Sequence, residues 1–233
     1  AIASVLSSLD DKIDLLHRQN KTLEAMAEAL FRQWFVEEAE ESGEKIPLST
    51  FADNIRDNVD IDNLAAYDKY VGLEHIPRKR IVLDNWGATD SLGSNKYAFK
   101  QNDILFGKLR SYFHKVVYAP FNGVCSTDVM VLRPKMEELF PFCLFWFFSE
   151  NVVDHSDIGS GGTRMPRTNW DIVGGYKVPT PNKKKIVSFN ETVMPVIIKM
   201  NENNKQIRTL EKLRNTLLPK LMSGEVRVIV KIG

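Results

Sequence analysis

The stretch IASVLSSLDDKIDLLHRQNKTLEAMAEALFRQWF (residues 2–35) decides the fold, because its apolar side chains recur at alternating spacings of four and three. The same ladder returns from Phe189 to Leu221, 187 residues after Ile2. One long helix buries such a narrow stripe against another. The sequence therefore predicts two antiparallel helices over residues 1–38 and 183–224. The pairing positions are Leu9, Ile13, Leu16, Asn20, Leu23 and Leu30 on the first helix, and Met200, Asn203, Ile207, Leu210 and Leu217 on the second.

The two ladders also share residues, such as Thr22-Leu23-Glu24 and Thr209-Leu210-Glu211. Two unrelated amphipathic helices on a globular core would explain the apolar faces but not this resemblance. Asn20 and Asn203, the polar members of the stripes, are expected to fix the register of the pair, and the alternative is that they bind a partner. Pro195 and Pro219 are expected to kink or end the second helix.

Composition indicates a folded, soluble protein of 233 residues with 43% hydrophobic side chains and a mean hydropathy of -0.23. No apolar run reaches the roughly 18 residues of a membrane-spanning helix. Cys125 and Cys143 lack metal-ligand spacing, so we expect no metal site and a reducing, cytoplasmic location. The chain does not begin with Met and its first heptad starts at once, which favours part of a longer protein.

The net charge of +1 is unevenly distributed. Residues 1–45 carry 5 basic and 10 acidic side chains (-5), residues 46–181 carry 15 and 16 (-1), and residues 182–233 carry 11 and 4 (+7). The two helical ends are thus complementary in sign. Opposite charges beside two heptad stripes favour pairing of these helices, in one chain or between copies.

The middle of the chain loses the helical period. Short β-rich runs at residues 69–73, 80–84, 115–119 and 129–134 lie between turn signals, and a helix is expected over residues 141–153. After Asp157 the glycine-rich, basic stretch IGSGGTRMPRTNW predicts a loop. The fold class is therefore α+β: a mixed, mostly antiparallel twisted sheet flanked by two long antiparallel helices. The predicted domains are helix 1–45, central domain 46–181, helix 182–228 and tail 229–233.

Basic and aromatic side chains are interleaved in residues 69–115, with nine Lys or Arg against four acids. This pattern is typical of nucleic-acid binding, and an ordinary solvated face is the alternative. Phosphate-loop, GxGxxG, HExxH and paired Cys/His motifs are all missing from the sequence. A hydrolase that uses Cys125 or His114 remains one alternative, but nothing in the sequence orients that pair.

Several segments together resemble one family, the specificity subunits of type I restriction-modification systems. The most specific are LLPKLMSGEV (217–226) and NDILFGKLR (102–110), supported by YVGLEHI (70–76) and GGTRMPRTNWDIVGGYKVPTP (161–181). The resemblance implies recognition domains that each read one half of a bipartite DNA target, without catalysis or a cofactor of their own. It also implies DNA methyltransferase (modification) subunits and a restriction motor subunit as partners, while no membrane is involved.

The resemblance also implies a role for the helices as a ruler. About 34 residues at about 1.5 Å rise span roughly 50 Å, or about 15 base pairs. With one recognition domain present, the chain is expected to be the second half of a longer subunit, and a natural half-length subunit remains open. We expect it to form a two-fold dimer because it would otherwise expose Phe31, Trp34 and Phe35.

Contacts with double-stranded DNA divide into base readers and phosphate partners. Arginine suits the acceptors of guanine, so Lys108, Arg110, Arg164 and Arg167 are the expected base readers. The expected phosphate partners are Lys79, Arg80, Lys96 and Lys115. The competing function is a coiled-coil protein-interaction adaptor without DNA specificity, which would lack the steep salt dependence of DNA binding. The sequence does not give the DNA target.

Overall fold

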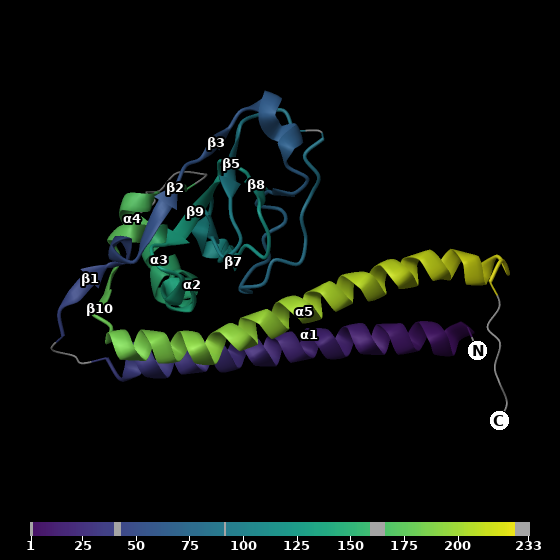
Figure 1. Ribbon diagram of the computed structural model, residues 1–233, viewed down its shortest axis with the longest axis horizontal. Helices are drawn as coiled ribbons and strands as arrows, with labels where there is room; N and C mark the ends of the chain where they lie inside the picture. Colours follow the sequence, from purple (N-terminus) through teal and green to yellow (C-terminus); the bar gives the residue numbers. More distant parts are fainter. Residues whose placement is uncertain (1, 40–42, 91, 159–165, 227–233) are drawn as a thin grey trace. The chain divides into compact units, whose positions relative to one another are not determined.

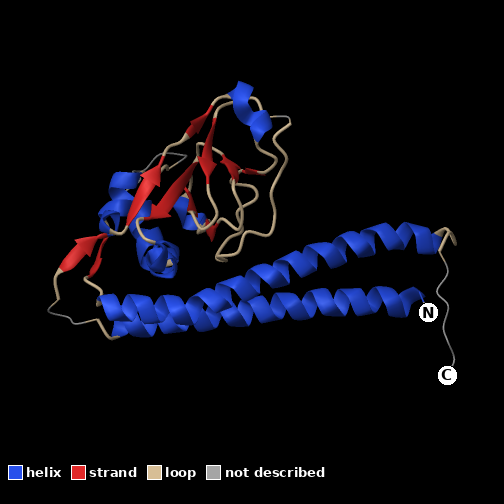
Figure 2. Ribbon diagram, in the orientation of Figure 1, coloured by secondary structure: helices blue, strands red, loops and turns tan. Residues whose placement is uncertain are grey.

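A computed structural model describes residues 2–39, 43–90, 92–158 and 166–226. The chain forms two compact units, one of Ala1–Ala27 with Pro195–Gly233 and one of Glu28–Met194. Both unit boundaries fall inside the long helices, and the domain limits at residues 45, 181 and 228 remain a prediction. The fold class is α+β with long helices and mostly antiparallel sheets, as predicted (Figure 2).

Helices α1 (Ile2–Arg32) and α5 (Lys183–Met222) run antiparallel in the first unit (Figure 1). Asp10 near the start of α1 pairs with Arg214 near the end of α5 at 2.7 Å. Ile13, Leu16 and Ile207 form a buried cluster with Leu210 packed against it. The complementary charges and the apolar ladder therefore act on the same pair of helices.

Three asparagines replace apolar contacts in the middle of this pair. The Asn20 amide donates to Asn204 Oδ1 at 2.8 Å, and the Asn203 amide donates to Asn20 Oδ1 at 2.9 Å. All three side chains are buried. Because Asn20 and Asn203 bond each other inside the seam, they are not accessible to a partner, which favours their role in fixing the register.

The long helices end differently from the sequence expectation. Helix α5 continues through both Pro195 and Pro219 to Met222, so neither proline ends it where it stands. Each proline removes one backbone donor, a local loss that a helix of 40 residues tolerates. Helix α1 ends at Arg32 and passes into a π-helical turn, Gln33–Glu37, so regular α-helix stops before the expected end at residue 38.

The second unit contains two four-stranded sheets and one two-stranded sheet. One has the order β2-β9-β6-β7 and is fully antiparallel, whereas β3-β5-β8-β4 contains one parallel pair, β4 with β8. β1 pairs with β10. The strands are β1 (Lys45–Pro47), β2 (Ala52–Ile55), β3 (Asn58–Val59), β4 (Tyr70–Val71), β5 (Lys96–Phe99), β6 (Ile104–Gly107), β7 (Val116–Tyr118), β8 (Gly123–Cys125), β9 (Val129–Pro134) and β10 (Lys177–Pro179).

The core of this unit lies between the two larger sheets. Leu105, Val117 and Val131 from one sheet meet Phe99 and Cys125 from the other. The opposite face of the first sheet is also covered, since the Tyr118 ring lies 6.1 Å from that of Phe140. Strands buried on both faces lose polar alternation, which explains the run of buried residues in β6.

Two expectations for the central domain are wrong in detail. The helix expected over 141–153 is two helices, α2 (Phe140–Phe148) and α3 (Glu150–Ile158), because Ser149 adopts an extended conformation. Its hydroxyl donates to Trp146 O at 2.7 Å and accepts from Val152 N at 3.4 Å. The run 80–84 is not a strand, and only Val82 forms a bridge, to Tyr118. The remaining short elements are η2 (Leu48–Thr50), η3 (Ile61–Ala66), η4 (Ser111–Phe113), η5 (Glu137–Leu139) and α4 (Trp170–Gly175).

The aromatic end of α1 is covered within this unit. Phe31 and Phe35 are only 3% and 4% exposed. Phe31 packs on Phe145 and Phe35 on Phe142, with ring centroids 5.7 and 4.9 Å apart. The expectation that Phe31 and Phe35 need a second copy to cover them is therefore wrong, because the apolar helix α2 already does so.

Replacing Asn20 by Ala should lower the free energy of unfolding by about 1–3 kcal/mol, because the buried amides of Asn203 and Asn204 are deprived of their partner. Replacing all three asparagines by Leu should recover that stability but relax the register. Urea denaturation measures the first effect. Disulfide formation between Asp10→Cys and Arg214→Cys, compared with a cysteine pair one heptad away, measures the second. Equal stability of parent and Asn20→Ala would contradict this role.

Candidate nucleic-acid interface

Four chain segments meet where the strands of the β2-β9-β6-β7 sheet begin or end, along one side of the sheet perpendicular to the strands. Because neighbouring strands are antiparallel, β2 and β6 end at the edge where β7 and β9 begin. The residues next to these strand ends are Arg56, Lys108, Lys115 and Asp128. This sheet edge, which we call the basic edge, thus gathers three cations and one acid from segments far apart in sequence.

The segment that follows the glycine-rich stretch is fixed to the basic edge by backbone hydrogen bonds. Arg110 N donates to Pro166 O at 2.9 Å, and Thr168 N donates to Lys108 O at 3.0 Å. Leu109 and Arg167 therefore form an antiparallel bridge. The structure brings together Lys108, Arg110 and Arg167, three of the four predicted base readers. The fourth, Arg164, lies outside the described residues.

Asp128 organises the charges at this edge. Its Oδ1 lies 2.7 Å from Arg167 Nη2, and its backbone carbonyl accepts from Lys108 N at 2.8 Å. Lys108 Nζ lies 5.8 Å from the centre of the Tyr97 ring. Burial lowers the pKa of Lys108; Asp128 opposes this effect, while Arg167 and Arg56 add to it. Arg167 and Arg56 are thus close enough to Lys108 to affect its pKa.

The turn between β6 and β7 is conformationally unusual. Arg110 and His114 flank η4 with φ angles of 51° and 50°, and Lys79, bonded to His114 O, has φ 51°. Non-glycine residues with such left-handed backbone angles concentrate at functional sites. The turn exposes Tyr112, and the Arg78 guanidinium lies 3.8 Å from the centre of the Phe113 ring.

The predicted phosphate partners do not all face solvent. Lys79 is exposed and pairs with Glu150 at 3.0 Å, while Arg80 pairs with Asp84 at 3.0 Å. Lys96 is buried in β5, where its ammonium donates to Ser94 O at 2.6 Å and to Ser94 Oγ at 2.7 Å. Lys115 donates to Leu73 O. Burial lowers the pKa of both Lys96 and Lys115. As they stand, these two ammonium groups are directed into the protein, which argues against phosphate contacts.

Sequence reasoning missed Arg56 and Asp128. Arg56 is the single cation in a segment with five Asp, residues 48–68, so it carried no visible basic signal. Asp128 lies in the turn before β9, and only the strand register shows that this turn meets Lys108. No local motif could have identified it.

The groups proposed for hydrolysis are unsuited to it. Cys125 is fully buried in the core, and burial raises the pKa of its thiol far above the usual range. His114 Nε2 is bonded to Phe148 O at 2.6 Å. Among the described residues, no group of three or more His, Cys, Asp and Glu side chains could hold a metal ion. Nor is any helix in the described part of the chain long and apolar enough to cross a membrane.

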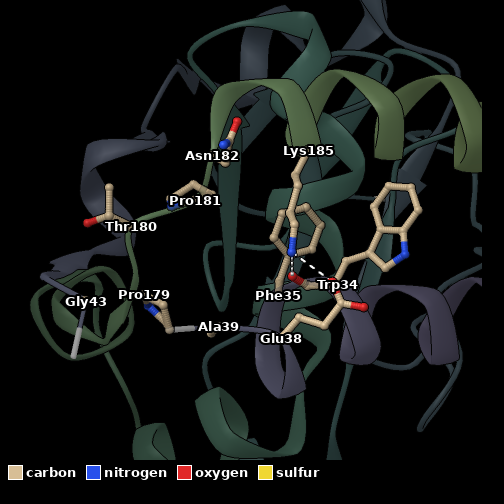
Figure 3. A pocket seen from close by; sticks show the side chains of 10 residues that line it. All are labelled: Trp34, Phe35, Glu38, Ala39, Gly43, Pro179, Thr180, Pro181, Asn182 and Lys185. Atoms are coloured by element: carbon tan, nitrogen blue, oxygen red, sulfur yellow. Dashed lines mark hydrogen bonds and ion pairs between the residues drawn. The ribbon is translucent and has the colours of Figure 1, made fainter. Parts of the chain in front are cut away.

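A hollow of about 270 Å³ lies where α5 begins (Figure 3). Trp34, Phe35 and Pro181 are among its lining residues. Lys185 donates to Glu38 Oε2 at 2.8 Å within it, which neutralises the two charges that face it. Another hollow, of about 630 Å³, is lined in part by Asp103 and Arg133, which bond each other through two hydrogen bonds of 2.7 Å. Among the described residues that line them, neither hollow has a Ser, Cys or His side chain to act as a nucleophile or base.

This arrangement is a sheet domain with a basic edge, joined to an antiparallel helix pair. Residues 53–212 match the type I restriction modification DNA specificity domain. Because the match covers more than half of the 233 residues, the chain belongs to that family.

Curated relatives are similar along almost the whole chain. The type I restriction enzyme MjaIX specificity subunit of Methanocaldococcus jannaschii is 25% identical over 97% of this chain and 58% of its own length. The HindI specificity subunit of Haemophilus influenzae is 23% identical over 97% of this chain and 66% of its own. These relatives carry the name of specificity subunits, in agreement with the prediction of a non-catalytic protein. The chain spans about three-fifths of their length.

A solved structure supports the fold. The crystal structure of the S subunit of the type I restriction-modification system from M. genitalium superposes with a TM-score of 0.60 at 17% identity. The match covers 99% of this chain and 61% of that one. Both the sheet domain and the helices are therefore part of the shared fold.

The burial of His114 predicts a pH dependence of stability. Burial lowers the pKa of His114, with Lys79 adding to the effect and the Phe148 carbonyl opposing it. The unfolded chain, with a His pKa of about 6.5, then takes up the proton first, so this contribution to stability is lost as pH falls below about 6.5 toward the lowered pKa.

His114→Asn removes the titrating group, while Asn tolerates the left-handed backbone and keeps an amide donor. The stability advantage of the parent over the variant should shrink from about pH 7.5 to about pH 5, by about 1.4 kcal/mol for each pH unit by which the pKa is lowered. Urea unfolding at several pH values measures it. Parallel stability profiles for the two proteins would refute this role of His114.

Proposed function

We propose that this chain recognises double-stranded DNA through the basic edge, as the specificity component of a type I restriction-modification system. The observation that carries the proposal is the convergence of Lys108, Arg110 and Arg167 at one sheet edge, in a chain that belongs to a DNA specificity family. Guanidinium and ammonium groups suit both phosphates and the guanine edge. The chain itself performs no chemistry in this proposal.

The proposed contacts fall into two groups, base readers and phosphate partners. Arg167 and Arg110, with Lys108 beside them, are the proposed base readers, and Arg56, Lys79 and Arg80 are the proposed phosphate partners. Lys96 and Lys115 are left out because their ammonium groups bond carbonyls inside the domain. Arg164 stays in the proposal on its sequence position alone, next to the segment that the basic edge holds.

Salt-titrated binding to a pool of random-sequence duplexes tests the DNA role. The double variant Arg56→Ala, Lys79→Ala, which removes two exposed phosphate partners of this proposal, should bind more weakly, and the slope of log affinity against log salt should fall by about 1 for each phosphate that the variant no longer neutralises. The matched control, Lys183→Ala with Lys184→Ala, removes two exposed cations at the start of α5 and should leave the slope unchanged.

An affinity for duplexes that hardly changes with salt would contradict DNA recognition. It would favour the competing function, a protein-interaction adaptor in which the helix pair binds other proteins. Equal weakening of affinity in the two double variants would show that charge in general, rather than the basic edge, attracts the DNA.

The bipartite target is a further part of the proposal. The sequence repeat places Leu218 and Met222 of α5 at the positions that Phe31 and Phe35 hold in α1. Phe31 and Phe35 are buried against the recognition domain, whereas Leu218 and Met222 are 40% and 78% exposed. We infer that a second recognition domain covers Leu218 and Met222, so that the helix pair sets the distance between two half-targets. The 31 residues of α1 span roughly 46 Å, or about 14 base pairs.

The second domain belongs either to a longer form of the subunit or to another copy of this chain. The expected two-fold dimer of this chain then rests on Leu213, Leu218 and Met222, because Phe31 and Phe35 are already covered. The DNA methyltransferase subunits and the restriction motor subunit are proposed partners of the assembled complex, on family grounds.

Sedimentation of the purified chain at micromolar concentrations tests the dimer. We expect a dimer that Leu218→Lys with Met222→Lys dissociates, because two charges would enter an apolar contact. Ile61→Lys, at an exposed apolar position of the sheet unit, is the control and should leave the dimer intact. A strict monomer would exclude the dimer while leaving DNA recognition standing.

A further inference from the structure

Arg167 is held more firmly than an ordinary surface arginine. The hydrogen bonds Arg110 N to Pro166 O and Thr168 N to Lys108 O flank it on both sides, at 2.9 and 3.0 Å. These bonds fix its backbone to the end of β6, whose own position is set by pairing with β9 and β7. The backbone position from which the Arg167 side chain extends is therefore as well defined as that of a strand residue.

The guanidinium group is also held at one end. Its Nη2 lies 2.7 Å from Asp128 Oδ1, yet the side chain remains 59% exposed. A guanidinium carries five donors in one plane, so a single ion pair leaves most of them available to another acceptor. An exposed ion pair of this kind contributes only about 0–1 kcal/mol to stability. Its main effect is thus on orientation rather than on folding.

Asp128 itself is fixed before any ligand arrives. Its amide donates to Ser126 Oγ at 3.2 Å, and its carbonyl accepts from Lys108 N at 2.8 Å. A carboxylate among Arg56, Lys108 and Arg167 weakens the attraction for phosphate, because it repels the DNA backbone. Such an acid is unfavourable in a surface that only clamps phosphates, but it is useful if it aims an arginine.

We propose that Asp128 is a positioning residue that holds Arg167 for bidentate recognition of a guanine in the major groove. Guanine offers the N7 and O6 acceptors that match two guanidinium donors. With one end of the side chain fixed by Asp128, less rotamer freedom is lost when the base is bound. This inference rests on the proposed DNA recognition and adds the base class, the reader and the residue that orients it.

The test begins with the preferred duplex that the full chain selects from a random pool. Each guanine of that duplex is then replaced in turn by 7-deazaguanine, which lacks the N7 acceptor. For the parent protein, one position should weaken binding by about ten-fold or more, as expected when a bidentate interaction is broken. In Arg167→Ala that position should no longer matter, and Arg167→Lys should recover little of the discrimination because Lys lacks the planar fork.

Asp128→Ala should reduce the discrimination at that same guanine without abolishing binding. Asp128→Asn keeps the shape but not the charge, and should lie between Asp128→Ala and the parent. The matched control is Asp53→Ala, which removes an exposed acid paired with Lys135 at 3.6 Å, at the opposite end of β2. It should leave the discrimination unchanged.

Several outcomes would overturn the inference. Tighter binding of Asp128→Ala to every duplex alike, with unchanged discrimination, would make Asp128 a repulsive charge only. Arg167→Ala that weakens all duplexes equally and lowers the salt slope would make Arg167 a phosphate clamp. A base preference that disappears in Asp128→Ala but not in Arg167→Ala would make Asp128 the reader. Failure of the parent to select any duplex would instead overturn the proposed function, and this inference with it.

Discussion

Burial of the apolar helix α2 is the constraint on which the arrangement of residues 28–194 depends. All nine of its side chains are buried. One face receives the ends of the long helices, with Phe31 and Trp146 at 5.1 Å and Phe145 and Phe189 at 6.1 Å between ring centroids. Another reaches the sheet through Phe140 and Tyr118. Burial of each aromatic side chain stabilises the fold by roughly 1.5–3 kcal/mol, so the packing of α2 connects the ends of the long helices to the sheet.

This packing also determines where the candidate site lies. Covering one face of the β2-β9-β6-β7 sheet with α2 and the other with the second sheet leaves only its edges for function. At the edge where β6 ends, the chain must turn back into β7, and that turn carries Arg110 and Tyr112. At the other edge, Asp103 is used in structure, accepting from Lys100 N and from the Arg133 guanidinium. Asp103 is thus fully engaged within the domain, whereas Arg167 at the basic edge keeps a side chain that is 59% exposed.

The sequence predicted the long helices well, whereas for the candidate site it shows which residues are charged but not where their side chains point. A ladder of Leu9, Ile13 and Leu16 is a local, periodic signal, and the partner ladder made the pairing identifiable. The break at Ser149 was missed, because FPFCLFWFF is apolar throughout and gives no boundary. Lys96 shows the limit for sites: its charge is visible in the sequence, but the direction of its side chain is not, since β5 is buried almost throughout. Asp128 depends on strand register, which composition does not encode.

The interactions that hold Arg167 in place are different from, and weaker than, those that stabilise the fold. Arg167 is connected to the domain by two backbone hydrogen bonds and one exposed ion pair, whereas the scaffold rests on the buried rings around α2. The exposed pair contributes about 0–1 kcal/mol, and the backbone bonds do not depend on which side chain residue 167 carries. Substitutions at Arg167 and Asp128 should therefore change the charge of the basic edge at little cost in stability. In the proposed function, the residues that read a base are not the ones that stabilise the core, so a new base preference would not require a new core.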